Sequence, residues 1–568
     1  MLKLNGIGVS EGIAFSKVFI YKKENPEIVK KAVKDTEAEL TKFKSALDES
    51  EEQLDLLYKK ACEELGEEDA GIFTAHKMFL EDPEFVLGIR ENINSGDNAE
   101  FAVKKVADSF IESFSLIDDE YIRERIADIK DVSERLIKNI MGIKEKSLSD
   151  IEEECIIAAY DLTPSDTAAM NKEKIKGFIT QIGGKTSHTS IIAKTIGIPA
   201  VVGVDDIFKR FKGGENIILD GFSGSVFISP DEDTAVKYME ISVNYNNEKN
   251  KLKKYTERET VTSDGKKYKV FANIANHHDV SYVTENGAEG IGLFRTEFIF
   301  MDRSSLPTED EQFEIYKSVL ESMAEKPVII RTLDIGGDKE AQALNLSKEA
   351  NPFMGYRAIR ICLDRKDIFK TQLRAILRAG VYGNAEIMFP MISSVEELLK
   401  AKDVLNEVKN ELKSENAEFS ENIKTGIMIE VPSAALISDI LAKNCDFFSI
   451  GTNDLIQYFT AVDRTNEKVQ DLYNPYNPAI IRILNYIIFN GLKAGITVGM
   501  CGELASDENF TDMLCGFGLN EFSVNPSSVL KTRRNICLSN SKDNEKKASD
   551  VLKAQSSDEV KNILKNGM

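Results

Sequence analysis

The chain has 568 residues, with 72 Lys or Arg against 94 Asp or Glu, so its formal net charge is -22. Its length predicts about three or four domains, and 42% hydrophobic with 29% charged residues is a globular composition. The acidic balance excludes a general binder of nucleic acid or anionic membranes, because both need a basic face. A local basic pocket for a small anion stays possible.

Cysteine usage and hydropathy point to the cytoplasm. The seven cysteines are scattered and form no CxxC pair, which indicates reduced thiols. The first six residues lack the apolar stretch of a signal peptide. The apolar segment 427–441 contains Glu430, Pro432 and Asp439, so no membrane span is expected.

The first part of the chain predicts an α/β domain with a helical insertion. Residues 6–21 suggest one or two short strands. From residue 26 to about 142, apolar residues recur at helical spacing, as in Leu40, Phe43 and Leu47, and helical stretches follow at 98–117 and 118–141. Strand-like segments return at 155–159, 177–182, 199–203, 216–220 and 226–230. Since strands flank the helical block, we expect a bundle inserted into one α/β domain. Residues 232–256 predict a helical connector.

After Gly265 the pattern becomes regular. Eight short strand candidates alternate with helix-forming segments, at 268–274, 289–294, 328–334, 385–391, 425–430, 446–451, 496–503 and 520–523. Repeated β-then-α units of this kind predict a (β/α)8 barrel of the TIM type, in which the carboxyl ends of the strands carry the chemistry.

The predicted strand ends are unusually polar. They carry Asn273, Arg295, Arg331 with Asp334, Glu430, Asn453 with Asp454, and Cys501 with Glu503. Guanidinium groups bind carboxylate and phosphate, so Arg295, Arg331 and Arg464 at one mouth predict a small polyanion as ligand. Glu430 and Asp454 offer the hard oxygen atoms that Mg²⁺ prefers. Arginines with carboxylate-held Mg²⁺ position a transferring phosphoryl group. Surface salt bridges are the alternative for any one of these residues taken alone.

Cys501 lies in Val-Gly-Met-Cys-Gly-Glu and has two interpretations. A cysteine in an apolar strand is commonly a small core residue. A thiol at a barrel mouth can also donate a proton to a carbanion-like carbon. The residues alone leave both open.

A second site is the octet 183–190, Gly-Gly-Lys-Thr-Ser-His-Thr-Ser, between a predicted strand and a predicted helix. The glycines permit a tight turn and the hydroxyl groups can cap the helix. His188 then lies at a helix N-terminus, where free N–H groups attract a phosphoryl group and favour the neutral imidazole. An ordinary capped turn with an incidental histidine is the alternative. The octet is no Walker A loop.

The octet resembles the phosphohistidine motif of enzymes that use phosphoenolpyruvate. Stretches 290–298, 331–339 and 448–455 resemble the phosphoenolpyruvate-binding barrel of those enzymes. The order of the motifs and the chain length, together with 74–82 and 118–125 in the helical block, are similar to the Enzyme I family of the phosphoenolpyruvate-dependent sugar phosphotransferase system. The resemblance covers essentially the whole chain.

The resemblance implies a role for each matched residue. His188 would carry the phosphoryl group on Nε2. Phosphoenolpyruvate would be bound by Arg295, Arg331, Asn453, Asp454 and Arg464. Glu430 and Asp454 would hold Mg²⁺, and Cys501 would protonate the enolate as pyruvate forms.

The resemblance also implies domains and partners. It implies a phosphohistidine domain of residues 1–23 and 144–230, and an inserted helical domain, 24–143, that binds the carrier protein HPr. A helical linker, 231–260, would lead to the phosphoenolpyruvate-binding barrel, 261–568, which would form a homodimer. Because His188 and the arginines belong to different domains and reacting atoms must approach to about 3–3.5 Å, the linker is the expected hinge region.

Departures from the family pattern are few. Residues 341–343 read Ala-Gln-Ala where the family usually has Leu-Pro-Tyr, and Lys185 replaces a common arginine. We interpret His277 and His278 as loop residues, and His76 as structural or part of the carrier-docking surface. An ATP-dependent relative, such as pyruvate phosphate dikinase or phosphoenolpyruvate synthase, needs a large ATP-binding domain that the sequence before His188 does not offer. A non-enzymatic scaffold would not need the full residue set.

Overall fold

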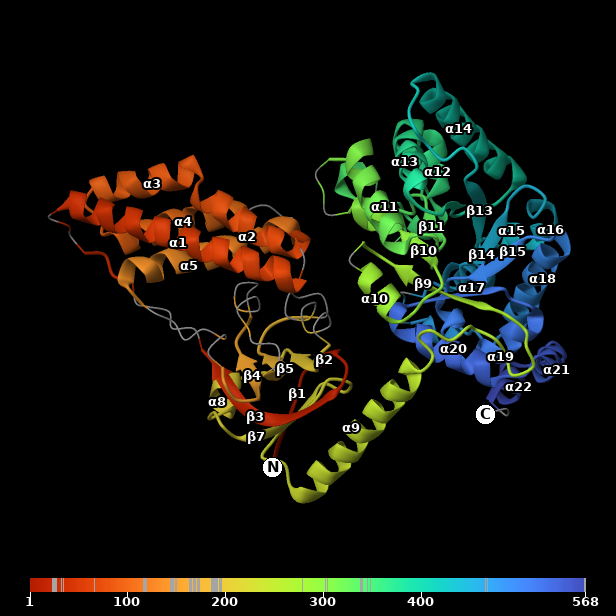
Figure 1. Ribbon diagram of the computed structural model, residues 1–568, viewed down its shortest axis with the longest axis horizontal. Coiled ribbons are helices and arrows are strands. Elements are labelled where there is room, and N and C mark those ends of the chain that lie inside the picture. Colours follow the sequence, from red (N-terminus) through yellow and green to blue (C-terminus); the bar gives the residue numbers. More distant parts are fainter. Residues whose placement is uncertain are drawn as a thin grey trace. The chain divides into compact units, whose positions relative to one another are not determined.

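The computed structural model (Figure 1) is described for residues 1–22, 28–31, 33, 35–65, 67–115, 120–143, 148, 151–162, 166, 170, 174–184, 190, 193, 197–277, 279–301, 303, 305–337, 341–344, 346–347, 349–464, 466 and 468–565. The chain divides into two compact units, Met1–Glu248 and Lys249–Met568, and each is treated by itself below. No described helix is both long enough and apolar enough to span a membrane.

The first unit contains a mixed sheet in the order β1-β8-β7-β3-β4-β5-β6-β2. Its strands are β1 (Leu2–Asn5), β2 (Ile7–Ser10), β3 (Ile13–Tyr21), β4 (Cys155–Ala159), β5 (Ile175–Thr180), β6 (Ala200–Val202), β7 (Asn216–Asp220) and β8 (Ser225–Ile228). Strands β3, β4, β5 and β6 run parallel, and the outer strands pair antiparallel. The sheet therefore joins strands from before and after the helical block, as the sequence predicted.

The opening segment differs from the prediction of one or two strands, since it forms three. Gly6 separates β1 from β2, and a Cβ atom there would lie 2.5 Å from the carbonyl oxygen of Val202. Gly12, with φ of 127°, separates β2 from β3. Two glycines at close or left-handed backbone positions thus divide one β-branched run into three strands.

Both faces of this sheet are covered. Ile157 and Phe178 belong to one apolar cluster, whereas Ile156 and Ile179 belong to another. Neighbouring residues of one strand point to opposite faces, so continuous apolar strands such as β4 are buried on both sides. The short helix α8 (Ile207–Arg210) contributes Ile207 to the second cluster.

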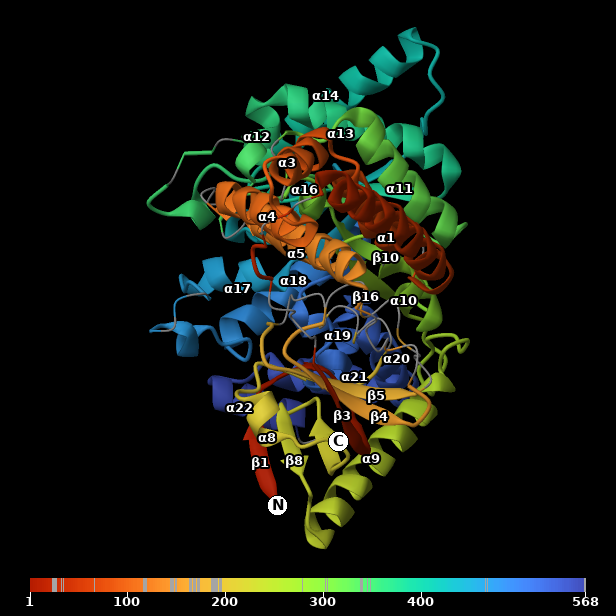
Figure 2. The ribbon, with the colours of Figure 1, turned by 90° about the vertical axis from the view of Figure 1, so that its left-hand side faces the viewer.

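The helical block forms a bundle of α1 (Thr36–Leu65), α2 (Glu67–Leu80), α3 (Pro83–Asn94), α4 (Ala99–Ser115) and α5 (Glu120–Met141). The helices lie alongside one another in both views (Figures 1 and 2). Phe43, Phe85, Ile89 and Leu136 are buried in their shared core. Asp82 caps α3 by accepting the N–H groups of residues 84 and 85, and Pro83 occupies the first turn.

Helix α9 (Glu232–Lys253) is the predicted connector. It contains no buried residue, although Tyr238 and Tyr245 contact the rings of Phe227 and Phe222. At the start of the second unit, Arg533 is 1% exposed and donates to the carbonyl oxygens of Tyr255 and Thr256. The segment after α9 is thereby attached to the barrel.

The second unit is a closed barrel of eight parallel strands, which confirms the predicted fold. The strands are β9 (Lys269–Ile274), β10 (Ile291–Arg295), β11 (Val328–Arg331), β12 (Ala385–Phe389), β13 (Lys424–Ile429), β14 (Phe447–Ile450), β15 (Thr497–Met500) and β16 (Glu521–Val524). Each lies within or next to one of the eight predicted strand segments.

Helices surround the barrel (Figure 1). They are α10 (Asp279–Glu285), α11 (Glu309–Met323), α12 (Ile359–Asp364), α13 (Lys366–Ala379), α14 (Val395–Ser414), α15 (Pro432–Leu436), α16 (Ser438–Leu441), α17 (Thr452–Thr460), α18 (Pro478–Ala494), α19 (Glu508–Phe517), α20 (Val529–Leu538), α21 (Ser541–Val551) and α22 (Ser557–Lys565). Strand residues alternate between two environments. Ile387 and Ile427 join the large cluster that contains the helix residues, whereas Met388 and Met428 join a small one with Cys501.

Candidate active site

The carboxyl ends of the barrel strands bring together the polar residues that the sequence predicted there. Arg295 and Arg331 are the last residues of β10 and β11, and Glu430 directly follows β13. Asp454 lies in the first turn of α17, after β14, and Cys501 follows β15. Because the strands are parallel, these side chains reach one mouth of the barrel.

Arg331 is held by two ion pairs. Its Nη2 lies 2.5 Å from Oε1 of Glu297, and its Nη1 lies 2.9 Å from Oδ2 of Asp334. Burial lowers the pKa of Arg331, but the carboxylates of Asp334 and Glu297 outweigh this effect, so its pKa is above the ordinary value. The guanidinium is thus a fixed positive charge in a buried part of the mouth.

Two further arginines approach the same place. Arg295 is partly buried, and burial together with repulsion from Arg331 lowers its pKa. Arg464 follows α17, where its backbone N–H donates to Gln457 over 3.1 Å and its Nη2 lies 3.7 Å from Oδ1 of Asp454. The predicted arginine set therefore converges, which suits an anion with more than one charged group.

Three carboxylates form the acidic part of the mouth. Burial first, and then the negative charges of Asp334 and Asp454, raise the pKa of Glu430 to about 8. Oε1 of Glu430 accepts the backbone N–H of Met391 over 2.7 Å, and Met391 has φ of 57°. The left-handed backbone at a bulky residue is strain of the kind that collects at functional sites.

This donor set fits a magnesium ion. Oδ1 of Asp454 is buried and accepts no hydrogen bond from any described residue, and its ion pair with Arg464 is long, 3.7 Å. A buried carboxylate oxygen without a hydrogen bond is costly. In the described part of the chain no three His, Cys, Asp or Glu side chains converge to hold a metal. Mg²⁺ is commonly bound by one or two carboxylates with water and substrate oxygens, and Glu430 with Asp454 would supply such a pair.

Cys501 lies on an apolar floor inside the barrel. It is 4% exposed and clusters with Leu293, Met388, Met428 and Phe447. Burial raises the pKa of its thiol to about 11, so the S–H form persists at neutral pH. Its Sγ donates to the carbonyl oxygen of Ile450 over 3.8 Å. A buried, protonated thiol is consistent both with a core residue and with a proton donor, so both interpretations of Cys501 stay open.

Asn453 is oriented by its surroundings. Its side chain exchanges two hydrogen bonds with Glu503, and the hydroxyl of Tyr473 donates to its carbonyl oxygen over 3.2 Å. Asn273, another of the polar strand-end residues, donates from Nδ2 to the carbonyl oxygens of Cys501 and Ser523 over 3.1 and 3.2 Å. It therefore fixes the backbone that carries the thiol.

The sequence did not single out two residues that complete this arrangement. Glu297, fully buried, balances Arg331, and Arg357 contacts both Asp334 and Asp454. Glu297 follows β10 and could have been noticed as a further polar strand-end residue. Arg357 lies in the long connection between β11 and α12, so its only signal was a position on a loop that follows a barrel strand.

The phosphohistidine octet is only partly covered. His188, Lys185, Thr186, Ser187 and Thr189 lie outside the described residues. Strand β5 leads to Gly183, which has φ of 120°, and the hydroxyl of Ser190 donates to the carbonyl oxygen of Gly184 over 2.6 Å. The role of His188 therefore stays a prediction.

Two of the other histidines, His76 and His277, lie in described parts of the chain. His76 is 1% exposed in the helical bundle, with Nε2 3.2 Å from Oδ1 of Asp128, and lines a cavity of about 360 Å³. Its burial agrees with a structural role. His277 lies in the loop after β9, whereas His278 is outside the described residues.

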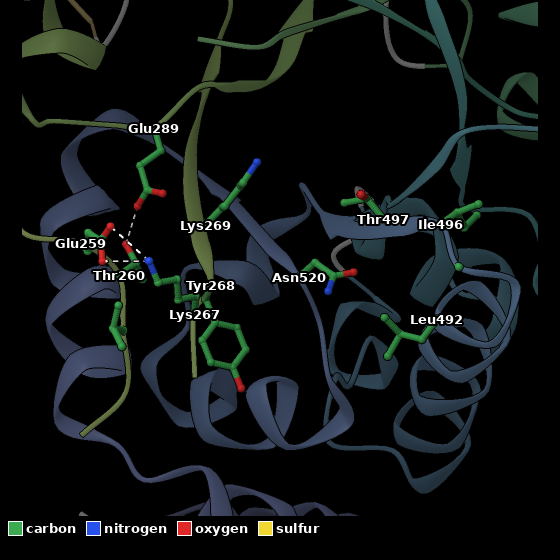
Figure 3. A pocket seen from close by; sticks show the side chains of 12 residues that line it. Glu259, Thr260, Lys267, Tyr268, Lys269, Glu289, Leu492, Ile496, Thr497 and Asn520 are labelled. Atoms are coloured by element: carbon green, nitrogen blue, oxygen red, sulfur yellow. Dashed lines mark hydrogen bonds and ion pairs between the residues drawn. The ribbon is translucent and has the colours of Figure 1, made fainter. Parts of the chain in front are cut away.

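A larger cavity, of about 540 Å³, lies at the opposite end of the barrel. Its walls include Lys269 and Thr497, which begin β9 and β15. Figure 3 shows the hydrogen bond from Thr260 to Glu289, 2.5 Å, and the ion pair of Lys267 with Glu259, 3.1 Å. The amino ends of barrel strands serve stability rather than chemistry, so the candidate active site is the other mouth.

Three family descriptions match the chain. They are the PEP-binding domain of PEP-utilising enzymes over residues 249–540, their N-terminal domain over residues 5–125, and their mobile domain over residues 151–224. The barrel with its arginines and carboxylates thus belongs to the phosphoenolpyruvate-binding class.

Individual proteins that resemble this chain define its family within that class. The chain is 48% identical to a phosphoenolpyruvate-protein phosphotransferase of Priestia megaterium, over 99% of each chain. It is 46% identical to one of Bacillus subtilis, over 100% of this chain and 99% of the relative. A solution structure of an Enzyme I protein shares 41% identity over 43% of this chain and 99% of its own, with a TM-score of 0.40. The chain belongs to the phosphoenolpyruvate-protein phosphotransferase, or Enzyme I, family, and it is an enzyme.

Proposed function

We propose that this enzyme transfers the phosphoryl group of phosphoenolpyruvate to its own His188, releases pyruvate, and passes the phosphoryl group to a histidine of the carrier protein HPr. This is the first step of sugar uptake by the phosphotransferase system. The observation that carries the proposal is the convergence of Arg295, Arg331 and Arg464 with Glu430 and Asp454 at one barrel mouth. That arrangement suits a small molecule with phosphate and carboxylate groups.

The reaction follows from these groups. The arginines and Asn453 bind phosphoenolpyruvate, and Nε2 of His188 attacks phosphorus. The bond between phosphorus and the enol oxygen breaks, its electron pair stays on that oxygen, and a phosphorus–nitrogen bond forms. The enolate takes the proton of the Cys501 thiol at its methylene carbon, which gives pyruvate. Solvent returns a proton to the thiolate.

We assign the metal to Glu430 and Asp454. The resemblance to the Enzyme I family implies a divalent metal, and the oxygen-only donor pair favours Mg²⁺. When bound, Mg²⁺ would supply positive charge opposite the phosphate oxygens. The protein's own part is to hold both carboxylates in place, which the bond from Met391 and the ion pair of Arg357 do.

We propose the following division of the chain. Residues 1–23 and 144–230 carry His188, residues 24–143 dock HPr, residues 231–260 are the linker, and residues 261–568 bind phosphoenolpyruvate. On the bundle, Met78 and Leu87 are 67% and 56% exposed, which supports a protein-docking role.

Because the seven cysteines are free thiols, we place the enzyme in the cytoplasm.

We also propose a homodimer that forms through the barrel. Leu436 on α15 and Phe489 on α18 are 59% and 57% exposed, and the hydroxyl of Tyr486 donates to the carbonyl oxygen of Leu436 over 3.4 Å. These neighbouring apolar side chains support a contact with a second copy. Phe489→Glu should shift the sedimentation coefficient towards the monomer. An unchanged coefficient would remove this face from the dimer.

One experiment tests donor, acceptor and partner together. Wild-type enzyme with phosphoenolpyruvate and Mg²⁺ should acquire an acid-labile phosphate at His188 and release pyruvate, and the label should move to HPr when HPr is added. His188→Ala should stay unlabelled, whereas His277→Asn should be labelled. ATP should not label the enzyme, since the relatives that match nearly the whole chain are named for phosphoenolpyruvate as the phosphoryl donor. Labelling of His188→Ala at the wild-type rate would contradict the mechanism.

A further inference from the structure

Arg357 is a fourth arginine of the active-site mouth, and it is 2% exposed. Its Nη2 lies 2.9 Å from Oδ1 of Asp334 and 3.1 Å from Oδ2 of Asp454. Its Nη1 donates to the hydroxyl of Tyr458 over 3.0 Å. Both terminal nitrogens therefore have partners within the protein.

The backbone around Arg357 keeps it in that position. Ala358 has φ of 54°, a left-handed conformation that costs energy at a residue with a Cβ atom. A Cβ atom on Gly336 would lie 2.4 Å from Cβ of Arg357, so only glycine fits beside it. The guanidinium also lies 5.9 Å from the ring centre of Phe353. Arg357 thus cannot turn towards a substrate without breaking several contacts.

Arg357 completes a chain of alternating charges across the mouth. Arg331 binds Oδ2 of Asp334, and Arg357 binds Oδ1 of the same carboxylate. On the other side, Arg357 takes Oδ2 of Asp454, whose Oδ1 is buried and accepts no hydrogen bond from the described residues. Arg357 thus fixes Oδ2 of Asp454 through a short ion pair. Among the described residues, Oδ1 has only the longer ion pair with Nη2 of Arg464, 3.7 Å, so this oxygen stays able to bind a ligand.

We propose that Arg357 is a positioning residue for the metal site: it fixes Oδ2 of Asp454 so that Oδ1 is directed to the cation, and it links that carboxylate through Asp334 to Arg331. The inference rests on the proposed assignment of Glu430 and Asp454 as metal ligands. The two ion pairs of Nη2 occupy both of its N–H groups, so this nitrogen serves the two carboxylates. Residues of this kind orient the groups that touch the metal.

The test measures metal binding without turnover. Mn²⁺ is titrated into the full-length protein, and free Mn²⁺ is followed by electron paramagnetic resonance. Arg357→Lys keeps the charge but not the planar fork, so we expect it to weaken Mn²⁺ binding roughly 10-fold, the scale seen when groups behind a metal ligand are changed. Arg360→Lys is the matched control, since Arg360 lies three residues further on, in α12, and its Nη1 donates to the carbonyl oxygens of residues 354 and 355 rather than to a carboxylate of the mouth. It should bind Mn²⁺ as the wild type does.

Kinetics separate positioning from general damage. For Arg357→Lys we expect the Mg²⁺ concentration at half-maximal rate to rise, while saturating Mg²⁺ restores most of kcat. A collapsed site would not be restored. Should Arg357→Lys fail to fold, Tyr458→Phe removes one bond to Arg357, together with the bond of the hydroxyl to the carbonyl oxygen of Phe353. A loss of Mn²⁺ affinity of about 2- to 3-fold is expected.

Two outcomes distinguish a failure of the inference about Arg357 from a failure of the proposed metal site. If Arg357→Lys binds Mn²⁺ like the wild type and Arg357→Gln binds it more tightly, Arg357 acts only as a nearby positive charge and the inference is overturned. If Asp454→Asn retains wild-type Mn²⁺ affinity, the proposed metal site itself is wrong.

Discussion

Asn453 and Glu503 hold each other through two hydrogen bonds at the barrel mouth. Nδ2 of Asn453 donates to Oε1 of Glu503 over 3.1 Å, and the backbone N–H of Glu503 donates to Oδ1 of Asn453 over 3.0 Å. The side-chain amide of Asn453 is therefore fixed before any ligand arrives. A preoriented amide loses little freedom when it binds a substrate.

Glu503→Ala should release this amide. One charge-assisted hydrogen bond is worth about 1.5 kcal/mol or more, which corresponds to roughly a 10-fold change in binding. We expect KM for phosphoenolpyruvate to rise by about that factor with a smaller change in kcat. Pyruvate release under steady-state conditions is the measurement. Glu508→Ala is the control, because Glu508 pairs with Lys531 outside the mouth. An unaltered KM in Glu503→Ala would show that Asn453 needs no support.

Cys501→Ala should separate the two interpretations of the thiol. As a proton donor, Cys501 contributes to the rate by roughly 100-fold or more. We therefore expect kcat to fall by that amount while the Kd for phosphoenolpyruvate, measured calorimetrically, changes little. Because burial raises the pKa of the thiol to about 11, the acid form is present throughout the neutral range and is lost only as pH rises towards that value. Loss of the Cys501 proton should therefore not reduce wild-type turnover near pH 8.5. Between pH 7 and pH 9, the pH profiles of wild type and Cys501→Ala should have the same shape. Normal turnover of the variant would make Cys501 a core residue.

Glu297→Ala should weaken both the barrel and the site. Glu297 and Arg331 are both buried, and removal of one partner from a buried pair costs about 3–5 kcal/mol. Urea unfolding should shift to a clearly lower midpoint, and phosphoenolpyruvate affinity should fall. Glu407→Ala breaks the more exposed pair with Lys370 and should cost less than about 1 kcal/mol. Equal midpoints for the two variants would argue against a structural role for the Glu297 pair.

Glu521 predicts a pH dependence of stability. It begins β16 inside the barrel, where burial, together with repulsion from Glu386, raises its pKa to about 8. The folded state thus binds a proton that the unfolded chain releases above its ordinary pKa of about 4. The resulting stability is fully present below that ordinary value and is lost as pH rises through about 8.

Glu521→Gln should remove this dependence. At pH 5 its urea midpoint should be close to that of the wild type, and at pH 9 the variant should be the more stable of the two. Glu259→Gln serves as control, because Glu259 is exposed and lies at the rim of the neighbouring cavity. A constant difference between Glu521→Gln and wild type from pH 5 to pH 9 would contradict the raised pKa.

The sequence determined the framework of this protein. Alternating β and α segments after residue 265 predicted all eight barrel strands, because apolar runs and turn residues encode local structure directly. Strand direction then predicted the meeting of Arg295, Arg331, Glu430 and Asp454, since parallel strands end at the same mouth. The proposed metal donors, Glu430 and Asp454, followed from residue chemistry alone.

Only the tertiary structure decided how these charges are paired. Arg357 lies in a connection without periodicity, so no spacing in the sequence relates it to Asp334 and Asp454, which it joins. The sequence also gave no sign that Glu521, at the start of a strand, would be buried with a raised pKa. Burial and charge pairing are properties of contacts between distant segments, and a one-dimensional pattern contains none of those distances. For this reason the sequence predicted which residues meet at the barrel mouth, and the fold decided which of them hold the others in place.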